Sequence, residues 1–247
     1  MLMGIRRQLA DTANRVLMPL GCQLVKVTEE SKPWDRYFAE WIAEAKAMGR
    51  DPNDIGDVAW GDDPLKDALD QHYLPHIKPT STVLELGPGS GRVTRHVISR
   101  CAEVILVDYS QMVCDWLNEY LNGKGNYTIH KIEKPSLSAV ASDSVDTILA
   151  NGVFEHIDMD DLVHFLEEFH RVLKPQGVVV FNFDNLMTDH GMQWYKQFRG
   201  RPGSRCLFRF YHPDAVRQLG ESAGFETLRL RATPTRFAYI ELRKARA

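Results

Sequence analysis

The chain has little of what marks secreted, membrane-spanning or repetitive proteins. Only four of its 247 residues are cysteines: Cys22, Cys101, Cys114 and Cys206. They form no Cys-x-x-Cys pair, and scattered cysteines are typical of a reducing compartment rather than of a disulfide framework. No segment approaches the roughly 18–20 apolar residues of a membrane span, and the apolar stretch 16–22 is interrupted by Pro19. We therefore expect a cytoplasmic protein.

The chain also lacks a strong charge of either sign. Thirty Lys and Arg against 33 Asp and Glu give a net charge of −3. This balance argues against broad nucleic-acid binding, although it leaves room for a local basic patch. Residues 4–17 place apolar side chains on one helical stripe beside three arginines. That stripe favours a helix packed on the rest of the protein, with weak peripheral membrane contact as the alternative.

From residue 82 onward, short apolar strands alternate with helices. Strands are predicted at 83–86, 104–107, 127–131, 145–150 and 178–183, with helices at 92–100, 111–121 and 160–173 between them. Strands that are apolar on both faces predict a parallel sheet covered on both sides. Two later strands, near 226–230 and 237–242, are joined too closely for a parallel crossover, so the last strand should run antiparallel. Residues 1–78 are predicted to form a helical N-terminal extension, with helices near 34–50 and 65–73, and residues 79–247 the main domain.

A glycine loop follows the first strand. In Glu85-Leu-Gly-Pro-Gly-Ser-Gly91, the glycines at 87, 89 and 91 let the backbone turn tightly and approach a ligand. Ligands of open α/β sheets bind at the carboxyl ends of the strands. A dinucleotide fingerprint would place a third glycine at position 92, where Arg92 stands. An NAD-linked oxidoreductase is therefore the weaker interpretation.

The acidic Glu85 before Gly-x-Gly-x-Gly resembles the first motif of class I S-adenosylmethionine-dependent methyltransferases. Segments at 142–157, 169–178 and 223–225 resemble later motifs of that family, so the likeness covers residues 82–230. It implies a Rossmann-like three-layer α/β sandwich, with a mainly parallel seven-stranded sheet and an antiparallel last strand. Trp60-Gly-Asp62 and Tyr73-Leu-Pro75 add a finer resemblance to bacterial methyltransferases that modify surface polysaccharides or sugars.

The resemblance implies S-adenosylmethionine as cofactor and assigns residues to it. Asp108, which ends the second strand, would accept the ribose hydroxyls, and Tyr109 and Met112 would flank the adenine. Glu133 stands where relatives contact the adenine amino group, but the glycine that follows in them is replaced by Lys134. Glu85 is expected near the methionine amino group, and Asn151, which ends the fourth strand, either contacts the methionine moiety or is a turn amide.

Candidates on the acceptor side are His156 and the long connection 185–211. His156 follows the fourth strand and is the first candidate for a general base, although a structural role for it and for Glu155 is the favoured interpretation, because many members of the family carry Glu-His here whatever their acceptor. Residues 185–211 interleave basic and aromatic side chains, which suits either a plain flap or a lid over an anionic or sugar acceptor. Arg199, Arg205 and Tyr211 are the predicted substrate-binding residues there. We expect no metal, because Asn151 stands where metal-dependent relatives need an aspartate.

The sequence therefore predicts an enzyme that transfers a methyl group from S-adenosylmethionine to an acceptor. We favour a hydroxyl of a sugar, glycan or anionic small molecule, and nucleic acid is disfavoured as a partner. The alternatives are a methyltransferase acting on nitrogen in RNA or a small molecule, and a non-catalytic cofactor-binding partner protein.

Overall fold

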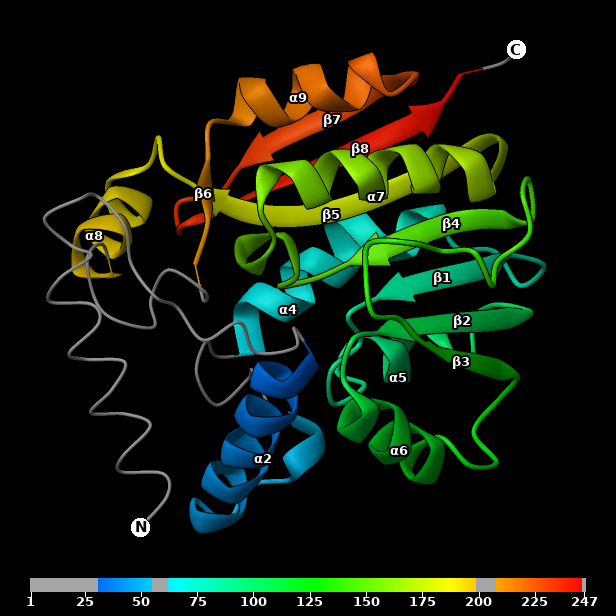
Figure 1. Ribbon diagram of the computed structural model, residues 1–247, viewed down its shortest axis with the longest axis vertical. Helices are drawn as coiled ribbons and strands as arrows, with labels where there is room; N and C mark the ends of the chain where they lie inside the picture. The colour runs from blue at the N-terminus through cyan, green and yellow to red at the C-terminus, as the bar shows by residue number, and fades with distance from the viewer. Residues whose placement is uncertain (1–30, 55–61, 199–207, 246–247) are drawn as a thin grey trace, which may run out of the picture.

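The structure is a computed structural model, and it describes residues 31–54, 62–198 and 208–245. A twisted sheet runs through the molecule with helices on both faces (Figure 1). Its strand order is β3-β2-β1-β4-β5-β8-β7, and a short strand, β6, pairs separately with β5. The order reverses between β1 and β4, which is where ligands bind in sheets of this type.

The strands of the parallel part are β1 (Thr82–Leu86), β2 (Glu103–Asp108), β3 (Tyr127–Lys131), β4 (Val145–Ala150) and β5 (Leu173–Asn185). The last strand, β8 (Phe237–Lys244), runs antiparallel to both β5 and β7 (Phe225–Ala232). The predicted mainly parallel sheet with an antiparallel last strand is thus confirmed. The two-residue strand β6 (Phe210–Tyr211) was not predicted, because so short a segment carries no periodic signal.

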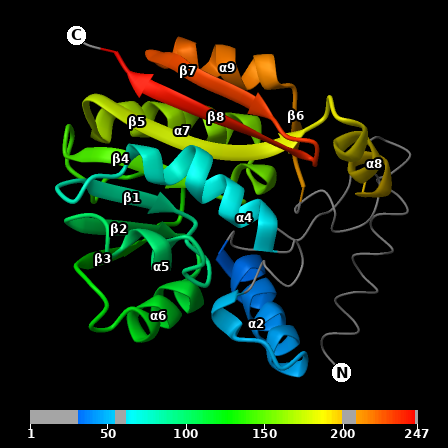
Figure 2. The same cartoon turned by 180° about the vertical axis from the view of Figure 1, so that it is seen from behind.

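Alternate residues of the central strands enter two separate cores. One core packs β1, β4 and β5 against α7 (Met159–Val172) and α9 (Pro213–Ser222), which lie in front of the sheet in Figure 1. The other packs the opposite face against α5 (Thr94–Val97) and α6 (Gln111–Tyr120) (Figure 2). Burial on both faces explains why these strands are mostly apolar on both faces.

The N-terminal extension shares the second core. Its described parts are α2 (Ser31–Ala47), a short turn η2 (Pro52–Asp54), and a continuous helical rod of α4 (Asp62–Ala68), the π-helical η3 (Leu69–Tyr73) and η4 (Leu74–His76). Phe38 of α2 and Leu65, Leu69 and Tyr73 of the rod are buried in the core beneath the sheet. The boundary at residue 78 remains a prediction, and the extension is packed as an integral part of the fold.

Two predicted helices differ from the structure. The helix predicted at 92–100 is reduced to α5, because the turn that contains Gly91 continues through Val93 and further turns follow Val97. The connection 185–211 contains α8 (Asp189–Phe198), where no helix was predicted. By contrast, the helix predicted at 111–121 is present as α6, and Ser110 caps it, since its side chain accepts a hydrogen bond from the Val113 amide.

Candidate functional site

The glycine loop lies where β1 ends, at the point of strand-order reversal. Gly87, Gly89 and Gly91 all have positive φ angles, of 65°, 54° and 85°. A Cβ on Gly87 would come within 2.5 Å of Val153 in the loop after β4, whereas one on Gly89 would meet nothing within 4 Å. Gly87 therefore allows two loops to touch, and Gly89 leaves open space above the turn. This space fits a ligand that rests on the backbone of the loop.

Asp108 is held beside that loop. Its carboxylate accepts hydrogen bonds from the amides of Ser110, at 2.8 Å, and of Gly89 and Tyr109. Burial nevertheless raises the pKa of Asp108 to about 6, and these amide hydrogen bonds act in the opposite direction. A buried carboxylate that is fixed at the end of the second strand fits the pair of ribose hydroxyls assigned to it.

Glu85 lies below the loop, with only 3% of its surface exposed. One of its oxygens, Oε2, accepts a hydrogen bond of 2.7 Å from the Thr94 hydroxyl on α5. Burial raises the pKa of Glu85 to about 7, and the Thr94 hydrogen bond opposes this rise. The partner of this carboxylate in the fold is thus Thr94, and its contact with a methionine amino group remains a prediction.

The other residues predicted around the adenosine lie at the ends of β2 and β3. Tyr109 packs against the first core, and Met112 is 39% exposed at the start of α6, where its amide donates to Asp35 of α2 at 3.2 Å. Glu133 is exposed and pairs with Lys131 at 3.1 Å, so its carboxylate is not held in place by burial. These three assignments remain predictions.

Asn151, directly after β4, is fixed by the N-terminal extension. Its Oδ1 accepts a hydrogen bond of 2.9 Å from the hydroxyl of Tyr73, which is fully buried in the π-helical segment. Neighbouring His72 on that segment is also buried, and its ring stacks on Tyr239 of β8 at 4.3 Å. The π-helical segment therefore places Tyr73 against Asn151 and His72 against Tyr239.

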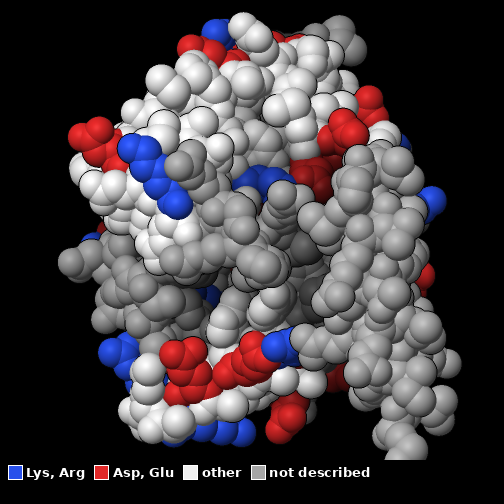
Figure 3. All heavy atoms as spheres, turned by 60° about the vertical axis from the view of Figure 1, so that its left-hand side comes forward, with Lys and Arg blue, Asp and Glu red and all other residues white. Residues whose placement is uncertain are grey.

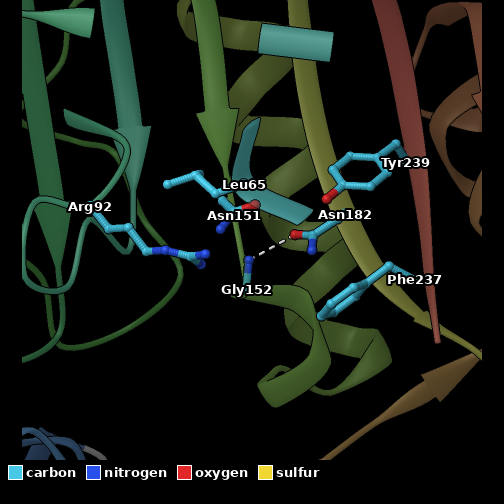
Figure 4. A pocket seen from close by; sticks show the side chains of 7 residues that line it. All are labelled: Leu65, Arg92, Asn151, Gly152, Asn182, Phe237 and Tyr239. Carbon is cyan, nitrogen blue, oxygen red and sulfur yellow. Dashed lines mark hydrogen bonds between the residues drawn. The ribbon is translucent and has the colours of Figure 1, made fainter. Parts of the chain in front are cut away.

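A small pocket opens beside Asn151 (Figure 4). The residues that line it come from α4, the glycine loop, the ends of β4 and β5, and β8: Leu65, Arg92, Asn151, Gly152, Asn182, Phe237 and Tyr239. Arg92 follows Gly91 directly, and Gly152 precedes Val153, which contacts Gly87. The pocket therefore adjoins the glycine loop on the side of β4 and β5.

A buried group of charges lies behind this pocket. Arg236, in the β7–β8 connection, donates to Asp184 of β5 at 2.5 and 2.6 Å and to Glu155 at 3.1 Å, and all three are nearly or fully buried. The second oxygen of Glu155, Oε2, has no hydrogen-bond partner among the described residues. Burial and the Glu155 carboxylate raise the pKa of Asp184, and the Arg236 guanidinium opposes this rise. Trp194 of α8 lies over the same guanidinium at 4.4 Å, which attaches this helix to the edge of the site.

His156 does not line the pocket formed by the described residues. Its ring lies between Trp34 of α2, at 4.9 Å, and Phe208, at 5.5 Å between ring centroids. Its Nε2 is 3.7 Å from Glu155 Oε1. His156 thus joins the extension to the 185–211 connection, and its role as a base remains a prediction.

The predicted substrate-binding residues are placed only in part. Arg199 and Arg205 lie outside the described residues, as do Trp60 and Gly61 of the finer resemblance. The side chain of Tyr211 is buried against Phe183, and its hydroxyl donates to the carbonyl of Ile157. Since that hydroxyl is already used within the core, the structure gives Tyr211 no group that faces an acceptor. Within the described ranges there is also no group of three or more His, Cys, Asp or Glu side chains that could hold a metal ion.

The sequence alone did not reveal several residues of the site: Tyr73, Asn182, Arg236 and Tyr239. They lie in four different segments, and only Tyr73 belongs to a motif of the finer resemblance, Tyr73-Leu-Pro75, which assigned it no contact in the site. The only signal in the sequence was the presence of polar residues in otherwise apolar strands, as with Asn182 and Asp184 in β5.

The fold and the glycine loop define a doubly wound α/β protein whose ligand site lies at the carboxyl ends of its parallel strands. Figure 3 shows the face that carries these ends, which is hollowed near its centre and bordered by side chains of both charges. Among the described helices, none has the length and apolar character that crossing a membrane requires.

Comparison with known proteins shows what this chain is similar to. Residues 84–181 match the methyltransferase domain model. Ribosomal RNA small subunit methyltransferase A of Dehalococcoides mccartyi is 35% identical over 106 residues, which cover 42% of this chain and 35% of that protein. An uncharacterized methyltransferase of Oceanobacillus iheyensis is 26% identical over 183 residues, covering 67% of this chain and 84% of the relative. A solved DhpI–SAH complex is 20% identical, with a TM-score of 0.63 over 90% of this chain and 100% of that one.

Residues 84–181 therefore match a methyltransferase domain, and the solved structure shares the fold of this chain. The predicted family, enzyme class and cofactor are confirmed at the level of this domain, whereas the sugar-modifying subtype is not. The chain spans about a third of the length of the ribosomal RNA methyltransferases that it matches.

Proposed function

We propose that the protein transfers a methyl group from S-adenosylmethionine to a hydroxyl of a sugar, glycan or anionic small molecule. The observation that carries this proposal is the position of the pocket beside Asn151, which adjoins the glycine loop and is lined by Arg92, two amides and a tyrosine. Polar groups of this kind orient a small, oxygen-rich molecule.

The residues of the chain divide this work between them. Gly87 and Gly89 would support the cofactor and Asp108 its ribose, and the bound cofactor would supply an activated methyl group. The enzyme then has mainly to align the acceptor and exclude water. The N-terminal extension would help to align the acceptor and to exclude water. Trp34 of α2 lies against His156, and Leu65 of the helical rod lines the pocket. His156 is the proposed acceptor of the hydroxyl proton, and Arg199 and Arg205 are proposed contacts of an anionic acceptor.

Methylation of RNA is the second candidate, and the ribosomal RNA methyltransferases among the relatives favour it. The net charge of −3 and the mixed charges around the hollow in Figure 3 favour a small acceptor instead. A partner protein that binds the cofactor without turnover is the remaining alternative.

An acceptor screen that measures release of S-adenosylhomocysteine tests these alternatives directly. The panel contains neutral sugars, sugar acids, nucleotide sugars and a short structured RNA, with Asp108→Ala as the control that should lose cofactor binding. We expect turnover with a sugar or acidic small molecule, and a steep loss of turnover in His156→Ala at nearly normal cofactor affinity. Turnover with RNA alone, or tight cofactor binding with no turnover of any acceptor, would overturn the proposal.

A further inference from the structure

The side-chain amide of Asn151 is held at one end by the N-terminal extension. Asn151 follows Ala150, which pairs with Leu86 in the register of β4 against β1, so it lies level with Gly87 of the glycine loop. Its Oδ1 accepts a hydrogen bond of 2.9 Å from the Tyr73 hydroxyl, and the side chain lines the pocket (Figure 4). The direction of this hydrogen bond therefore decides which end of the amide can meet a ligand.

The Tyr73 hydroxyl is the donor in this contact. The residue is fully buried, and burial raises the pKa of its hydroxyl well above the ordinary value, so the group stays protonated. Its only other acceptor among the described residues is the Ala150 carbonyl, which is more distant at 3.5 Å. The amide oxygen of Asn151 is thus used by the fold. Its Nδ2 group is left as a donor, and it donates to no residue in the described ranges.

The helical rod that carries Tyr73 is fixed to the sheet at further points. The Thr147 hydroxyl of β4 donates to the His76 carbonyl at 2.8 Å. On β8, the Glu241 carboxylate bridges the rings of His72 and His76, at 2.7 Å from Nδ1 and 3.1 Å from Nε2 respectively. Because the rod is attached to both β4 and β8, the position of the Tyr73 hydroxyl is set by the packed fold rather than by the ligand.

A second amide in the pocket has the same polarity. Asn182 of β5 lies on the other side of Gly152 (Figure 4), and its Oδ1 accepts a hydrogen bond of 2.7 Å from the Gly152 amide. A backbone N–H can only donate, so the Nδ2 group of Asn182 is also left as a donor. It donates to no residue that the structure describes. Both amides therefore use their oxygens within the fold and keep their N–H groups for a ligand.

Amide N–H groups match the lone pairs of an oxygen and do not match an ammonium group, which is itself only a donor. We propose that Tyr73 is a positioning residue, which orients the Asn151 amide so that its nitrogen donates to an oxygen of the bound ligand. Without the Tyr73 hydroxyl, the amide could turn and present its own oxygen to that ligand. This inference rests on the proposed function, since it concerns the ligands of the same site.

The test is calorimetry on the full chain with S-adenosylhomocysteine and with 5′-methylthioadenosine, which lacks the amino-acid end. Tyr73→Phe removes only the hydroxyl, and Asn151→Ala removes the whole amide. We expect affinity for S-adenosylhomocysteine to be about tenfold weaker in Asn151→Ala and about threefold weaker in Tyr73→Phe, with affinity for 5′-methylthioadenosine unchanged. The double variant should bind as weakly as Asn151→Ala and no weaker, because Tyr73 acts through the amide.

Two further variants separate orientation from structure. Asn151→Asp keeps an acceptor for the Tyr73 hydroxyl but removes the N–H donor, so it should bind S-adenosylhomocysteine no better than Asn151→Ala. Tyr127→Phe is the matched control, because its hydroxyl lies on β3 and donates to the Asn118 carbonyl. It should bind both compounds as wild type does.

The ligand oxygen can belong to the carboxylate of the cofactor or to the acceptor, and glucuronate binding to protein saturated with S-adenosylhomocysteine separates these sources. Weaker binding of S-adenosylhomocysteine in Tyr73→Phe assigns the oxygen to the cofactor, whereas weaker binding of glucuronate alone assigns it to the acceptor. The inference is overturned if Tyr73→Phe changes neither affinity, or if it weakens 5′-methylthioadenosine as much as S-adenosylhomocysteine. It is also overturned if Tyr73→Phe weakens binding further in the Asn151→Ala background. Failure of wild-type protein to bind S-adenosylhomocysteine at all would instead refute the proposed function.

Discussion

The buried charges behind the pocket give the sharpest prediction about stability. Replacing Arg236 with Met removes a guanidinium that is only 2% exposed and that binds Asp184 and Glu155. Two buried carboxylates would then face each other without a counter-charge. Breaking a buried pair in this way costs about 3–5 kcal/mol in the free energy of unfolding. For a chain of this size the corresponding fall in melting temperature is about 6–20 °C.

The loss should depend on pH with a defined sign. Burial and Glu155 raise the pKa of Asp184, and loss of Arg236 removes the effect that opposes this rise. The folded variant then holds a proton that the unfolded chain releases above about pH 4. Since the folded state binds more protons over that interval, its stability falls as pH rises from about 4 through the raised pKa. Because the pKa of Asp184 is already about 8 in the wild type, both folded proteins hold this proton below that pH and lose stability alike. The deficit relative to wild type should therefore grow only above about pH 8, by up to about 1.4 kcal/mol per unit.

The assay is thermal unfolding of wild type and Arg236→Met at pH 6, 7, 8 and 9. Arg217→Met is the matched control, because Arg217 pairs with Asp214 and Glu221 on the exposed side of α9, where such pairs contribute about 0–1 kcal/mol. Adding Asp184→Asn and Glu155→Gln to Arg236→Met should remove the pH dependence. Melting temperatures of Arg236→Met within 2 °C (roughly one experimental error) of wild type at pH 8 would refute the assignment of a buried ionic cluster.

Two predictions concern the cofactor site. Burial raises the pKa of Asp108 to about 6, and only the ionised carboxylate can accept both ribose hydroxyls. Calorimetry should therefore show that the affinity for S-adenosylhomocysteine rises about tenfold per pH unit below pH 6 and levels off above it. If the Asp108→Asn variant shows the same pH profile as wild type, this carboxylate is not the group responsible. Gly87→Ala should weaken cofactor binding and lower the melting temperature, because its Cβ would come within 2.5 Å of Val153. Gly123 also has a positive φ, but a Cβ there would have no atom within 4 Å, so Gly123→Ala should alter only the melting temperature. Equal cofactor affinity in the two alanine variants would contradict the account of the loop.

Local sequence signals were sufficient for most of the fold. Apolar strands that alternate with helices predicted the parallel sheet, and the short connection before β8 predicted its antiparallel direction. The loop with Gly87, Gly89 and Gly91 and the acid at position 108 are continuous motifs, so their place at the strand ends followed from the chain order. The prediction failed where the signal was short or broken, as in the two-residue β6 and the reduced α5.

The pocket beside Asn151 was decided by tertiary structure alone. Tyr73 and Asn151 are 78 residues apart, and Arg236 lies 81 residues from Glu155. No local pattern connects such pairs, because their contacts depend on the register of β5 against β8 and on the packing of the N-terminal rod. The sequence by itself determined that a glycine-rich loop ends the first strand, since turn geometry is local. Only the packed sheet determined which donors meet beside it, since that meeting is a property of strands distant in the chain.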